Sequence, residues 1–383
     1  MQPPQSKLPG VGTTIFTVMS RLAAETGAIN LGQGFPDFQP PARLRELVKQ
    51  HLAAGHNQYA PMAGLPALCE AIAEQAARRH GWAIDPAQEV TITAGATEAL
   101  FAAIHAIVRA GDEVIVLDPS YDSYGPAAQL AGARLVHVPL APPDFGIDFD
   151  RLAAAINTRT RLLIVNTPLN PAGAVLDAGD WDRIADLLES RDAYVLSDEV
   201  YDSLVFDGRR HLGALSNRRL RERAFSVFSF GKTFNATGWK VGYCLAMPEL
   251  TTEFRKVHQF LTFSVSTPMQ YAIAEFIREA PGFPDGLAAF YQERRDRFIS
   301  LLQGSRFAVT KAAGTYFQLA DYSAVSDLPD TEFCVELTRR HGVAAIPLSP
   351  FCNEPPRARL IRFCFAKDDA TLERAAGQLR AIR

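Results

Sequence analysis

The segment that organises the chain is SFGKTFNATGWKVGY, residues 229–243. It follows an apolar run and contains two lysines, three glycines and hydroxyl side chains on both sides of Lys232. Phe230 and Phe234 flank this lysine, and Lys240 follows closely. A lysine amine that is desolvated beside a second cation loses its proton easily and becomes a nucleophile for carbonyl groups. The segment is therefore suited to an aldehyde and a phosphate, although an ordinary solvated lysine is the alternative.

Three other segments have the pattern of buried parallel strands that end in polar side chains. The continuous apolar runs cover residues 113–117, 161–165 and 193–196. They lead into the loops that carry Tyr121, Asn170 and Asp198, and ligands collect at the carboxyl ends of such strands. A carboxylate there needs a charged partner, so Asp198 indicates a cationic ligand group; a helix N-cap is the alternative. For Tyr121, packing in the core is the alternative.

A strand at residues 90–93, a turn of small residues at 94–97 and a helix at 98–108 are predicted next to one another. Free backbone N–H groups and the helix dipole converge at such a turn and attract an anion. Gly95 and Ala96 leave room for a phosphate, although many strand-to-helix turns look alike. The segment lacks G-x-G-x-x-G, which argues against a nicotinamide dehydrogenase.

Towards the end of the chain, Leu360 to Phe365 is an alternating strand with Arg362 inside it. A planar guanidinium held in an apolar strand is suited to gripping a carboxylate, and a structural salt bridge is the alternative. Short strands at 315–319 and 344–347 indicate a second, smaller α/β unit. Near the start, residues 15–24 form an amphipathic helix by their spacing.

Composition narrows the function classes. A length of 383 residues suggests two domains, and 48% hydrophobic and 21% charged residues are ordinary for a globular protein. A net charge of −3 gives no footprint for nucleic acid or an anionic membrane. Five scattered cysteines fit free thiols in a reducing compartment, with no zinc-site spacing, and no metal is expected. Without a signal-length or membrane-spanning apolar run, we expect a cytoplasmic protein.

Together these motifs resemble those of fold-type-I pyridoxal-phosphate enzymes, in particular class I aminotransferases. Among these, the chain is most similar to the bacterial methionine aminotransferases of the kynurenine and glutamine transaminase branch. The resemblance implies an α/β fold with a large doubly wound domain, whose mostly parallel sheet has seven strands, and a smaller α/β domain formed by both termini. The expected boundaries are 1–40 for the N-terminal arm and part of the small domain, 41–270 for the cofactor-binding domain and 271–383 for the small C-terminal domain.

The resemblance also implies a role for each site residue. Lys232 would bond covalently to pyridoxal 5'-phosphate and act as the catalytic base, while Asp198 would keep the pyridine nitrogen protonated. Tyr121 would stack on the ring, and Asn170 and Tyr201 would bind its phenolic oxygen. The cofactor phosphate would be held by Gly95, Ala96, Thr97, Ser229, Lys240 and, from the other subunit of a homodimer, Tyr59. The Asn170–Pro171 peptide is expected to be cis.

For the substrate, the resemblance implies that Arg362, Asn170 and the backbone at Gly34 hold the α-carboxylate. Phe16 and Phe263 would line the side-chain pocket, with core packing as the alternative for both. The implied reaction moves the α-amino group of methionine, or of another neutral amino acid, to a 2-oxo acid by a ping-pong mechanism.

Three alternatives stay open at this stage. One is a kynurenine or glutamine-type transaminase, or a cysteine-conjugate C–S β-lyase, on the same scaffold. Another is a non-catalytic regulator with an aminotransferase-like domain, opposed by the short N-terminal segment and the lack of basic charge. The third is the dehydrogenase that the missing glycine fingerprint disfavours.

Overall fold

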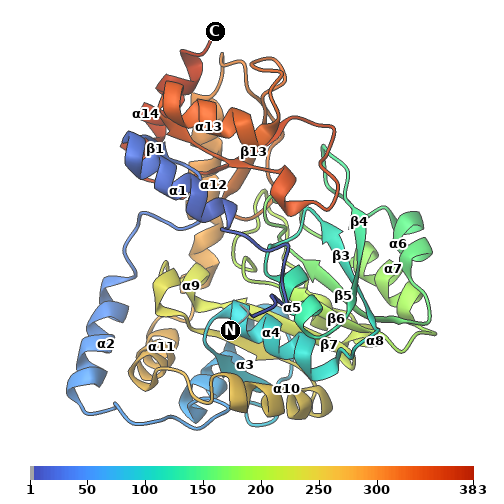
Figure 1. The fold of residues 1–383 in the computed structure, drawn as a ribbon. Coiled ribbons are helices and arrows are strands. Elements are labelled where there is room, and N and C mark those ends of the chain that lie inside the picture. Colours follow the sequence, from blue (N-terminus) through green and yellow to red (C-terminus); the bar gives the residue numbers. More distant parts are fainter. Residues whose placement is uncertain (1–3) are drawn as a thin grey trace.

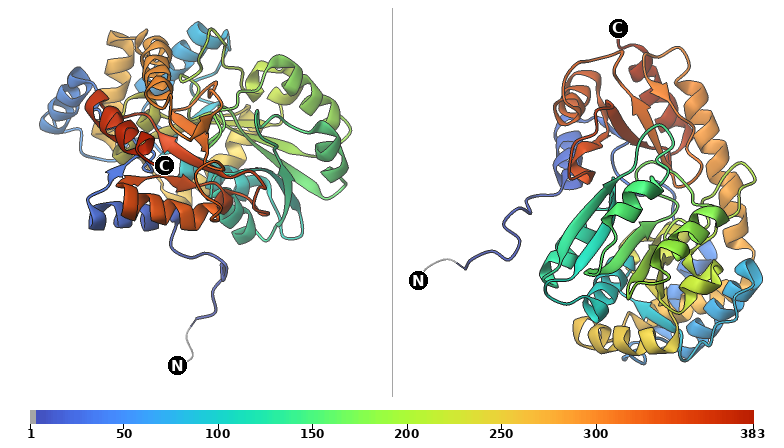
Figure 2. Two further views of the ribbon diagram at one scale, coloured as in Figure 1. Left: turned by 90° about the horizontal axis from the view of Figure 1, so that it is seen from above. Right: turned by 90° about the vertical axis from the view of Figure 1, so that its right-hand side faces the viewer.

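The structure, a computed structural model, describes residues 4–383. Figure 1 shows a large sheet-centred part below and a smaller part above, where the N-terminal helix α1 (Ile15–Thr26) lies beside the C-terminal helices. The long helix α12 (Phe283–Leu301) runs from the larger part into the smaller one, as the right-hand view of Figure 2 makes clear. Within residues 4–383 no helix has the length and apolarity that crossing a membrane requires.

The large domain is built on a seven-stranded sheet. In spatial order the strands are β2 (Val90–Thr93), β8 (Gly242–Leu245), β7 (Ala224–Ser229), β6 (Tyr194–Asp198), β5 (Thr160–Asn166), β3 (Glu113–Asp118) and β4 (Arg134–Pro139). Only β8 pairs with its neighbours in antiparallel fashion, and the other pairings are parallel. The predicted mostly parallel, seven-stranded sheet is thus confirmed.

Helices cover both faces of this sheet because its central strands are apolar on both sides. Alternate residues of β3 and β5 enter two different cores. One core contains side chains of α4 (Ala96–Ile107), α5 (Tyr124–Leu130) and α10 (Pro248–Leu261). The other contains those of α2 (Ala42–Ala53), α3 (Pro66–His80), α6 (Phe149–Ala155), α7 (Ala178–Leu188) and α11 (Thr267–Glu279). The fold is doubly wound, as expected.

The small domain combines both ends of the described chain. Its antiparallel sheet has the order β12 (Ile346–Pro347), β13 (Leu360–Cys364), β10 (Phe317–Asp321) and β9 (Ala308–Val309). Strand β1 (Ile29–Asn30) pairs in parallel with β11 (Val343–Ala344). A single core joins residues of α1, α12, α13 (Asp330–His341) and α14 (Asp369–Arg380).

Several element boundaries differ from the sequence-based expectation. Helix α4 begins at Ala96 rather than at residue 98, because Gly95 already forms its N-cap. Strand β6 runs on through Asp198, and no helix starts there within the described chain, so the N-cap interpretation of Asp198 was wrong. The expected strand 344–347 is two short strands in different sheets. Strand β10 begins two residues later than predicted, at Phe317.

Candidate active site

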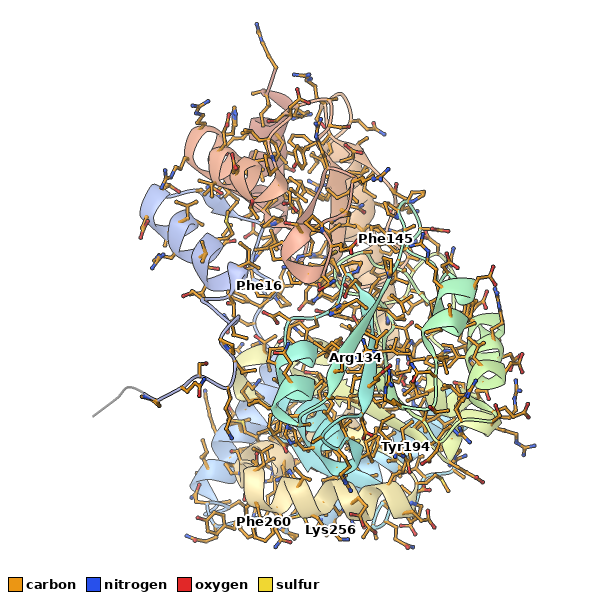
Figure 3. All side chains as sticks on the ribbon, turned by 45° about the vertical axis from the view of Figure 1, so that its right-hand side comes forward. Phe16, Arg134, Phe145, Tyr194, Lys256 and Phe260 are labelled. Atoms are coloured by element: carbon orange, nitrogen blue, oxygen red, sulfur yellow. The ribbon has the colours of Figure 1, made fainter. Side chains whose placement is uncertain are left out.

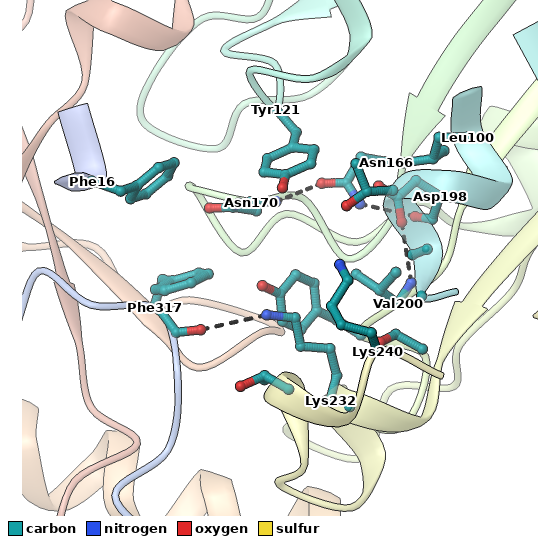
Figure 4. Close-up of a pocket in the computed structure, with 18 of the residues that line it drawn as sticks. Phe16, Leu100, Tyr121, Asn166, Asn170, Asp198, Val200, Lys232, Lys240 and Phe317 are labelled. Carbon is teal, nitrogen blue, oxygen red and sulfur yellow. Dashed lines mark hydrogen bonds between the residues drawn. The ribbon is translucent and has the colours of Figure 1, made fainter. Parts of the chain in front are cut away.

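A cavity of about 260 Å³ opens at the carboxyl edge of the large sheet and faces the small domain. It gathers side chains that are far apart in the sequence (Figure 4). All but two of the sequence-predicted site residues line it. The predicted residues that line the cavity are Phe16, Gly34, Gly95, Ala96, Thr97, Tyr121, Asn170, Asp198, Tyr201, Ser229, Lys232, Lys240 and Arg362.

One end of the cavity is built to receive an anion. Gly95 adopts φ 78° and ψ 170°, a conformation essentially restricted to glycine, and brings the start of α4 against Lys240. A Cβ at Gly95 would lie 3.2 Å from Lys240 Nζ. Since the helix begins at Ala96, the N–H groups of its first turn lack partners within the helix. These N–H groups, the hydroxyls of Thr97 and Ser229 and the Lys240 ammonium all border the same space.

The middle of the cavity holds a buried carboxylate. Asp198 ends β6 and is only 4% exposed. Tyr124 donates a hydrogen bond from its hydroxyl to Asp198 Oδ2 at 2.5 Å, and the Val200 N–H contacts Oδ1 at 3.4 Å. Desolvation raises the Asp198 pKa to about 6, although the bond from Tyr124 opposes that rise. No cationic side chain of residues 4–383 lies within ion-pair distance of Asp198, so the carboxylate is open to a cationic ligand.

Asn166 and Asn170 connect this carboxylate segment to the substrate side of the cavity. Asn166 donates from Nδ2 to the Asp198 carbonyl at 2.8 Å, and its Oδ1 accepts the Asn170 N–H at 2.8 Å. The Asn170–Pro171 peptide is cis, as predicted. This arrangement leaves the Asn170 side chain facing the small domain.

Lys232 extends into the cavity from α9 (Phe230–Thr233). Desolvation lowers its pKa to about 8; Cys364 and Asp198 raise it, while the cations Arg362 and Lys240 lower it. The expectation that Phe230 and Phe234 surround the amine was wrong, because these rings stack on each other in the core at 5.6 Å. The rings near the amine are those of Tyr201 and Tyr316, each with its centroid 5.6 Å from Nζ.

Arg362, in the middle of β13, is fully buried. Its guanidinium donates from Nη1 to Asn170 Oδ1 at 2.8 Å and from Nη2 to the Gly32 carbonyl at 2.9 Å. The Phe317 ring lies 3.9 Å from its central carbon. Among the described residues it makes no salt bridge, and its Nε has no partner, so the structural-salt-bridge interpretation was wrong. The guanidinium is a cation that retains capacity for an anionic ligand.

Aromatic rings form the wall beside this guanidinium. Phe16, from α1, lies 5.2 Å from the Arg362 central carbon and 5.5 Å from the Phe351 ring. Figure 3 shows Phe16 at the boundary between the upper and lower parts of the molecule. Phe16 and Tyr121 are both half-buried, and both border the cavity. Uncharged aromatic side chains therefore form one wall beside Arg362.

Two predicted site residues lie outside the cavity of the single chain. Tyr59 is 82% exposed and Phe263 is 44% exposed, and their rings meet edge to face at 5.4 Å. The alternative of core packing for Phe263 was wrong, because the side chain is on the surface. Phe263 also has φ 68°, an uncommon value for an aromatic residue.

Comparison with known proteins gives the site its context. The model of the family "Aminotransferase class I and II" matches residues 26–379. The chain belongs to the class I and II aminotransferase family. It is 52% identical to methionine aminotransferase of Escherichia coli, over 99% of this chain and 98% of that protein. A solved structure of an E. coli methionine aminotransferase superposes on it with a TM-score of 0.97, over 99% of this chain and 100% of that one.

Two further relatives span nearly the whole chain. A probable N-succinyldiaminopimelate aminotransferase of Mycobacterium tuberculosis is 40% identical, with 98% of each chain covered. A kynurenine–oxoglutarate transaminase of Homo sapiens is 36% identical, with 98% of this chain and 97% of that protein covered. Enzymes of this family use pyridoxal phosphate, and the protein is a pyridoxal-phosphate-dependent aminotransferase.

The cavity of this aminotransferase fits the cofactor. The glycine-lined end has N–H groups and a lysine for a phosphate, and a side chain at Gly95 would fill that space. Asp198 is a buried carboxylate without a cationic partner in the described chain, which suits a protonated ring nitrogen. Lys232 combines a lowered pKa with a position between these two ends.

Sequence reasoning missed several residues of the site. Tyr124 donates a hydrogen bond to Asp198, and Asn166, at the end of β5, donates to the carbonyl at the end of β6. Tyr316 contacts Lys232, and Phe317 packs against Arg362. Asn166 had a detectable signal, because it ends a predicted apolar strand just as Asp198 does. Tyr124 is the first residue of the short helix α5, and Tyr316 precedes a strand of the other domain, so only the fold brings these two side chains to the site.

We expect Gly95→Ala to weaken the affinity for pyridoxal phosphate by at least about tenfold, because the added Cβ disturbs Lys240 and the glycine-only conformation. Titration of the apoenzyme, followed by visible absorbance, measures this affinity. Gly81→Ala is the matched control, since Gly81 also has positive φ but nothing lies within 4 Å of its added Cβ. Equal affinities of the two variants would contradict the assignment.

We expect Lys232 of the apoenzyme to react with pyridoxal phosphate at a rate that rises with pH through a midpoint near 8. The neutral amine is the nucleophile, and its lowered pKa makes it neutral at a lower pH than an ordinary lysine, whose pKa is about 10.4. Stopped-flow absorbance at a series of pH values gives the midpoint. Arg362→Met removes a cation and should move the midpoint upwards, whereas a wild-type midpoint near that of free lysine would refute the assignment.

Proposed function

We propose that the enzyme transfers the α-amino group of methionine to a 2-oxo acid. The observation that carries this proposal is the 52% identity with the E. coli methionine aminotransferase over the whole chain. The cavity supports it, because an apolar aromatic wall of Phe16 and Phe317 lies beside the one guanidinium that borders the site in residues 4–383. A polarizable thioether packs well against aromatic rings.

In this proposal Arg362 and Asn170 hold the substrate α-carboxylate. The two hydrogen bonds of Arg362 use one N–H on Nη1 and one on Nη2, so the Nε–H and a second N–H on each terminal nitrogen would be available to the carboxylate. Phe317 keeps the guanidinium plane fixed from one side. The α-carbon would then lie between the guanidinium and the Lys232 amine, where the backbone of Gly34 bounds the space.

Lys232 is proposed as the covalent attachment point and as the base that takes the substrate α-proton. A pKa near 8 leaves about a tenth of the amine neutral at pH 7, far more than for an ordinary lysine with a pKa of about 10.4, and a general base has to be neutral. Bound pyridoxal phosphate supplies the aldehyde and an electron-withdrawing ring that stabilises the carbanion left by loss of the proton. Asp198 would hold the ring nitrogen, and Tyr124 would keep the carboxylate oriented.

The remaining proposed roles concern the fixed parts of the cofactor. Ser229, Lys240 and the turn at residues 95–97 would bind the phosphate, while Tyr121 would cover the ring. Asn170 and Tyr201 would face the phenolic oxygen. The domain boundaries near residues 40 and 270 stay predictions.

We expect methionine alone, without a 2-oxo acid, to convert the lysine-bound cofactor to pyridoxamine phosphate, with loss of its visible absorption band. The amino group stays on the enzyme until a 2-oxo acid takes it away, as ping-pong kinetics require. Lys232→Ala should slow this half-reaction by more than about a thousandfold. Conversion by N-succinyldiaminopimelate or kynurenine but not by methionine would replace the substrate and keep the enzyme class.

A C–S β-lyase on the same scaffold is the second candidate, because the same carbanion can also expel a sulfur leaving group. The kynurenine transaminase relatives at 36% identity favour keeping this broader branch in view. Incubation with a cysteine conjugate separates the two reactions. Pyruvate release at a rate comparable to methionine conversion would assign the lyase.

We also propose a homodimer in which Tyr59 reaches the cofactor phosphate of the partner subunit. The exposed ring pair of Tyr59 and Phe263 supports this, and Phe260, on the preceding helix, is a further exposed aromatic residue at 86% exposure. Phe260 lies at the lower surface on α10 (Figure 3). Hydrogen bonds from Ser264 to the Ala60 carbonyl and from Thr267 to the Gln58 carbonyl fix the two loops together.

We expect light scattering to give twice the chain mass of 41.9 kDa. We further expect Tyr59→Phe to weaken binding of pyridoxal phosphate by roughly 10- to 100-fold, the usual worth of a hydrogen bond to a charged group. Binding of unphosphorylated pyridoxal is the control and should not change. A monomer with full affinity would contradict this proposal.

For the location we propose the cytoplasm. The support is that all five cysteines are free thiols, four of them buried, which suits a reducing compartment. Recovery of the native enzyme from an oxidising compartment by cell fractionation would contradict it.

A further inference from the structure

The Lys232 amine meets two oxygen atoms at the floor of the cavity. Its Nζ lies 3.0 Å from the Tyr316 hydroxyl and 3.4 Å from the Gly34 carbonyl oxygen. In Figure 4 the Lys232 side chain points towards the cavity centre, with a hydrogen bond at its tip. Tyr316 comes from the small domain and Lys232 from the large one, so this contact crosses the domain boundary.

The direction of these hydrogen bonds follows from the chemistry of the acceptors. The Tyr316 hydroxyl donates to the Gly34 carbonyl at 2.7 Å, and a carbonyl oxygen only accepts. The single hydroxyl proton of Tyr316 is thus already used, and the oxygen presents a lone pair to Lys232. The amine has to donate to Tyr316, and its other close neighbour, the Gly34 carbonyl, also accepts.

A neutral amine has two N–H bonds and one lone pair. We propose that Tyr316 is a positioning residue whose hydroxyl, together with the Gly34 carbonyl, takes both N–H bonds of the free Lys232 amine and leaves its lone pair facing the cavity. The lone pair is then held in the position from which it can accept the substrate α-proton. When the α C–H bond breaks, its proton forms the third N–H bond and its electron pair stays on the substrate. In the proposed transamination the ammonium would then give that proton to the carbon of the cofactor's aldehyde group, not back to the α-carbon.

Tyr316 is firmly held. It is fully buried, and its ring contacts Tyr201 at 5.3 Å and Phe317 at 4.8 Å, both edge to face. The preceding residue, Thr315, has φ 65°, which is a strained conformation for a β-branched side chain. The Thr315 N–H donates to the Leu204 carbonyl of the large domain at 2.9 Å, so the strained residue is anchored there.

The same segment supports the other substrate-binding group. Phe317 follows Tyr316, which contacts Lys232, and the centroid of its ring lies 3.9 Å from the central carbon of the Arg362 guanidinium. A Cβ on Gly34 would lie 3.0 Å from the Phe317 ring, so Gly34, Phe317 and Arg362 pack closely together. The start of β10 therefore places the base and the carboxylate-binding guanidinium relative to each other.

The inference rests on the proposed role of Lys232 as base, and the test separates the two. The variant is Tyr316→Phe, which keeps the ring and removes the hydroxyl. The matched control is Tyr322→Phe, because Tyr322 is equally buried at the end of the same strand and donates to the Leu328 carbonyl at 2.8 Å, away from the cavity. Lys232→Ala tests the underlying role independently.

We expect the Tyr316→Phe holoenzyme to convert methionine about 10- to 100-fold more slowly in a single turnover. This is less than the full contribution of a positioned general base, which is about 10²- to 10⁴-fold, because Lys232 itself is still present. KM should change less than about twofold, and the kinetic isotope effect with α-deuterated methionine should increase, because proton transfer becomes slower. Tyr322→Phe should match the wild type in all three measurements.

A second readout uses the apoenzyme. Acetylation of Lys232 over a pH series, read by mass spectrometry, gives the pKa of the amine, which also senses Arg362, Lys240, Asp198 and Cys364. We expect a lower midpoint in Tyr316→Phe, because the ammonium form loses an acceptor, and no change in Tyr322→Phe.

An unchanged rate, isotope effect and midpoint in Tyr316→Phe would overturn the inference. Equal losses in both tyrosine variants would also overturn it, because that pattern reports a structural role. If Tyr316→Phe does not fold, a fluorinated tyrosine at position 316, whose oxygen is a weaker acceptor, has to slow proton transfer; an unchanged rate refutes the proposal. Full activity of Lys232→Ala would instead refute the role of Lys232.

Discussion

Two opposite charges are buried in one cavity without neutralising each other, and the rest of the site depends on this. Asp198 and Arg362 are both shielded from water, yet neither forms a salt bridge within residues 4–383. Burying unpaired charges is costly, and here hydrogen bonds from Tyr124 to Asp198, and from Arg362 to Asn170 and Gly32, reduce that cost. The cavity can therefore bind a ligand that brings a cationic group to Asp198 and an anionic group to Arg362.

The fold keeps these charges apart by assigning them to different domains. Asp198 ends a parallel strand of the large domain, where the strand carboxyl ends meet. Arg362 lies opposite Leu319 in the antiparallel pairing of β13 with β10 in the small domain. Lys232 lies between them, and the two nearby cations, Arg362 and Lys240, help to lower its pKa. Charge separation by the domain architecture thus also prepares the nucleophile.

Three residues with positive φ lie around the same cavity. Gly95, Lys240 and Thr315 all have positive φ, and each lies at or next to a residue that lines the cavity or contacts Lys232. Glycine adopts positive φ without a steric penalty, whereas in Lys240 and Thr315 such a conformation costs roughly 1–3 kcal/mol and persists when surrounding contacts determine it. Here Gly95 makes room for Lys240, and Thr315 directs Tyr316. These positions follow the needs of the site rather than local preference.

The sequence pattern by itself determined the buried strands and the polar loops at their ends, while the doubly wound domain and most residue roles followed from the resemblance to class I aminotransferases. Continuous apolar strands have to be covered on both faces, and their polar ends then meet at one edge, which is why Tyr121, Asn170 and Asp198 could be predicted together. Arg362 stood out as the single charge in an apolar strand, and Lys232 as one of two lysines in a glycine-containing segment.

Only the tertiary structure decided what surrounds those residues. The partners of Lys232 are Tyr316 and Gly34 rather than its neighbours Phe230 and Phe234, because a short helix turns the phenylalanines into the core. Likewise Tyr124 reaches Asp198 across 74 residues, and Arg362 reaches Asn170 across 192. Hydrogen-bond partners depend on the packing of separate elements, and local sequence patterns carry no signal for such distant contacts.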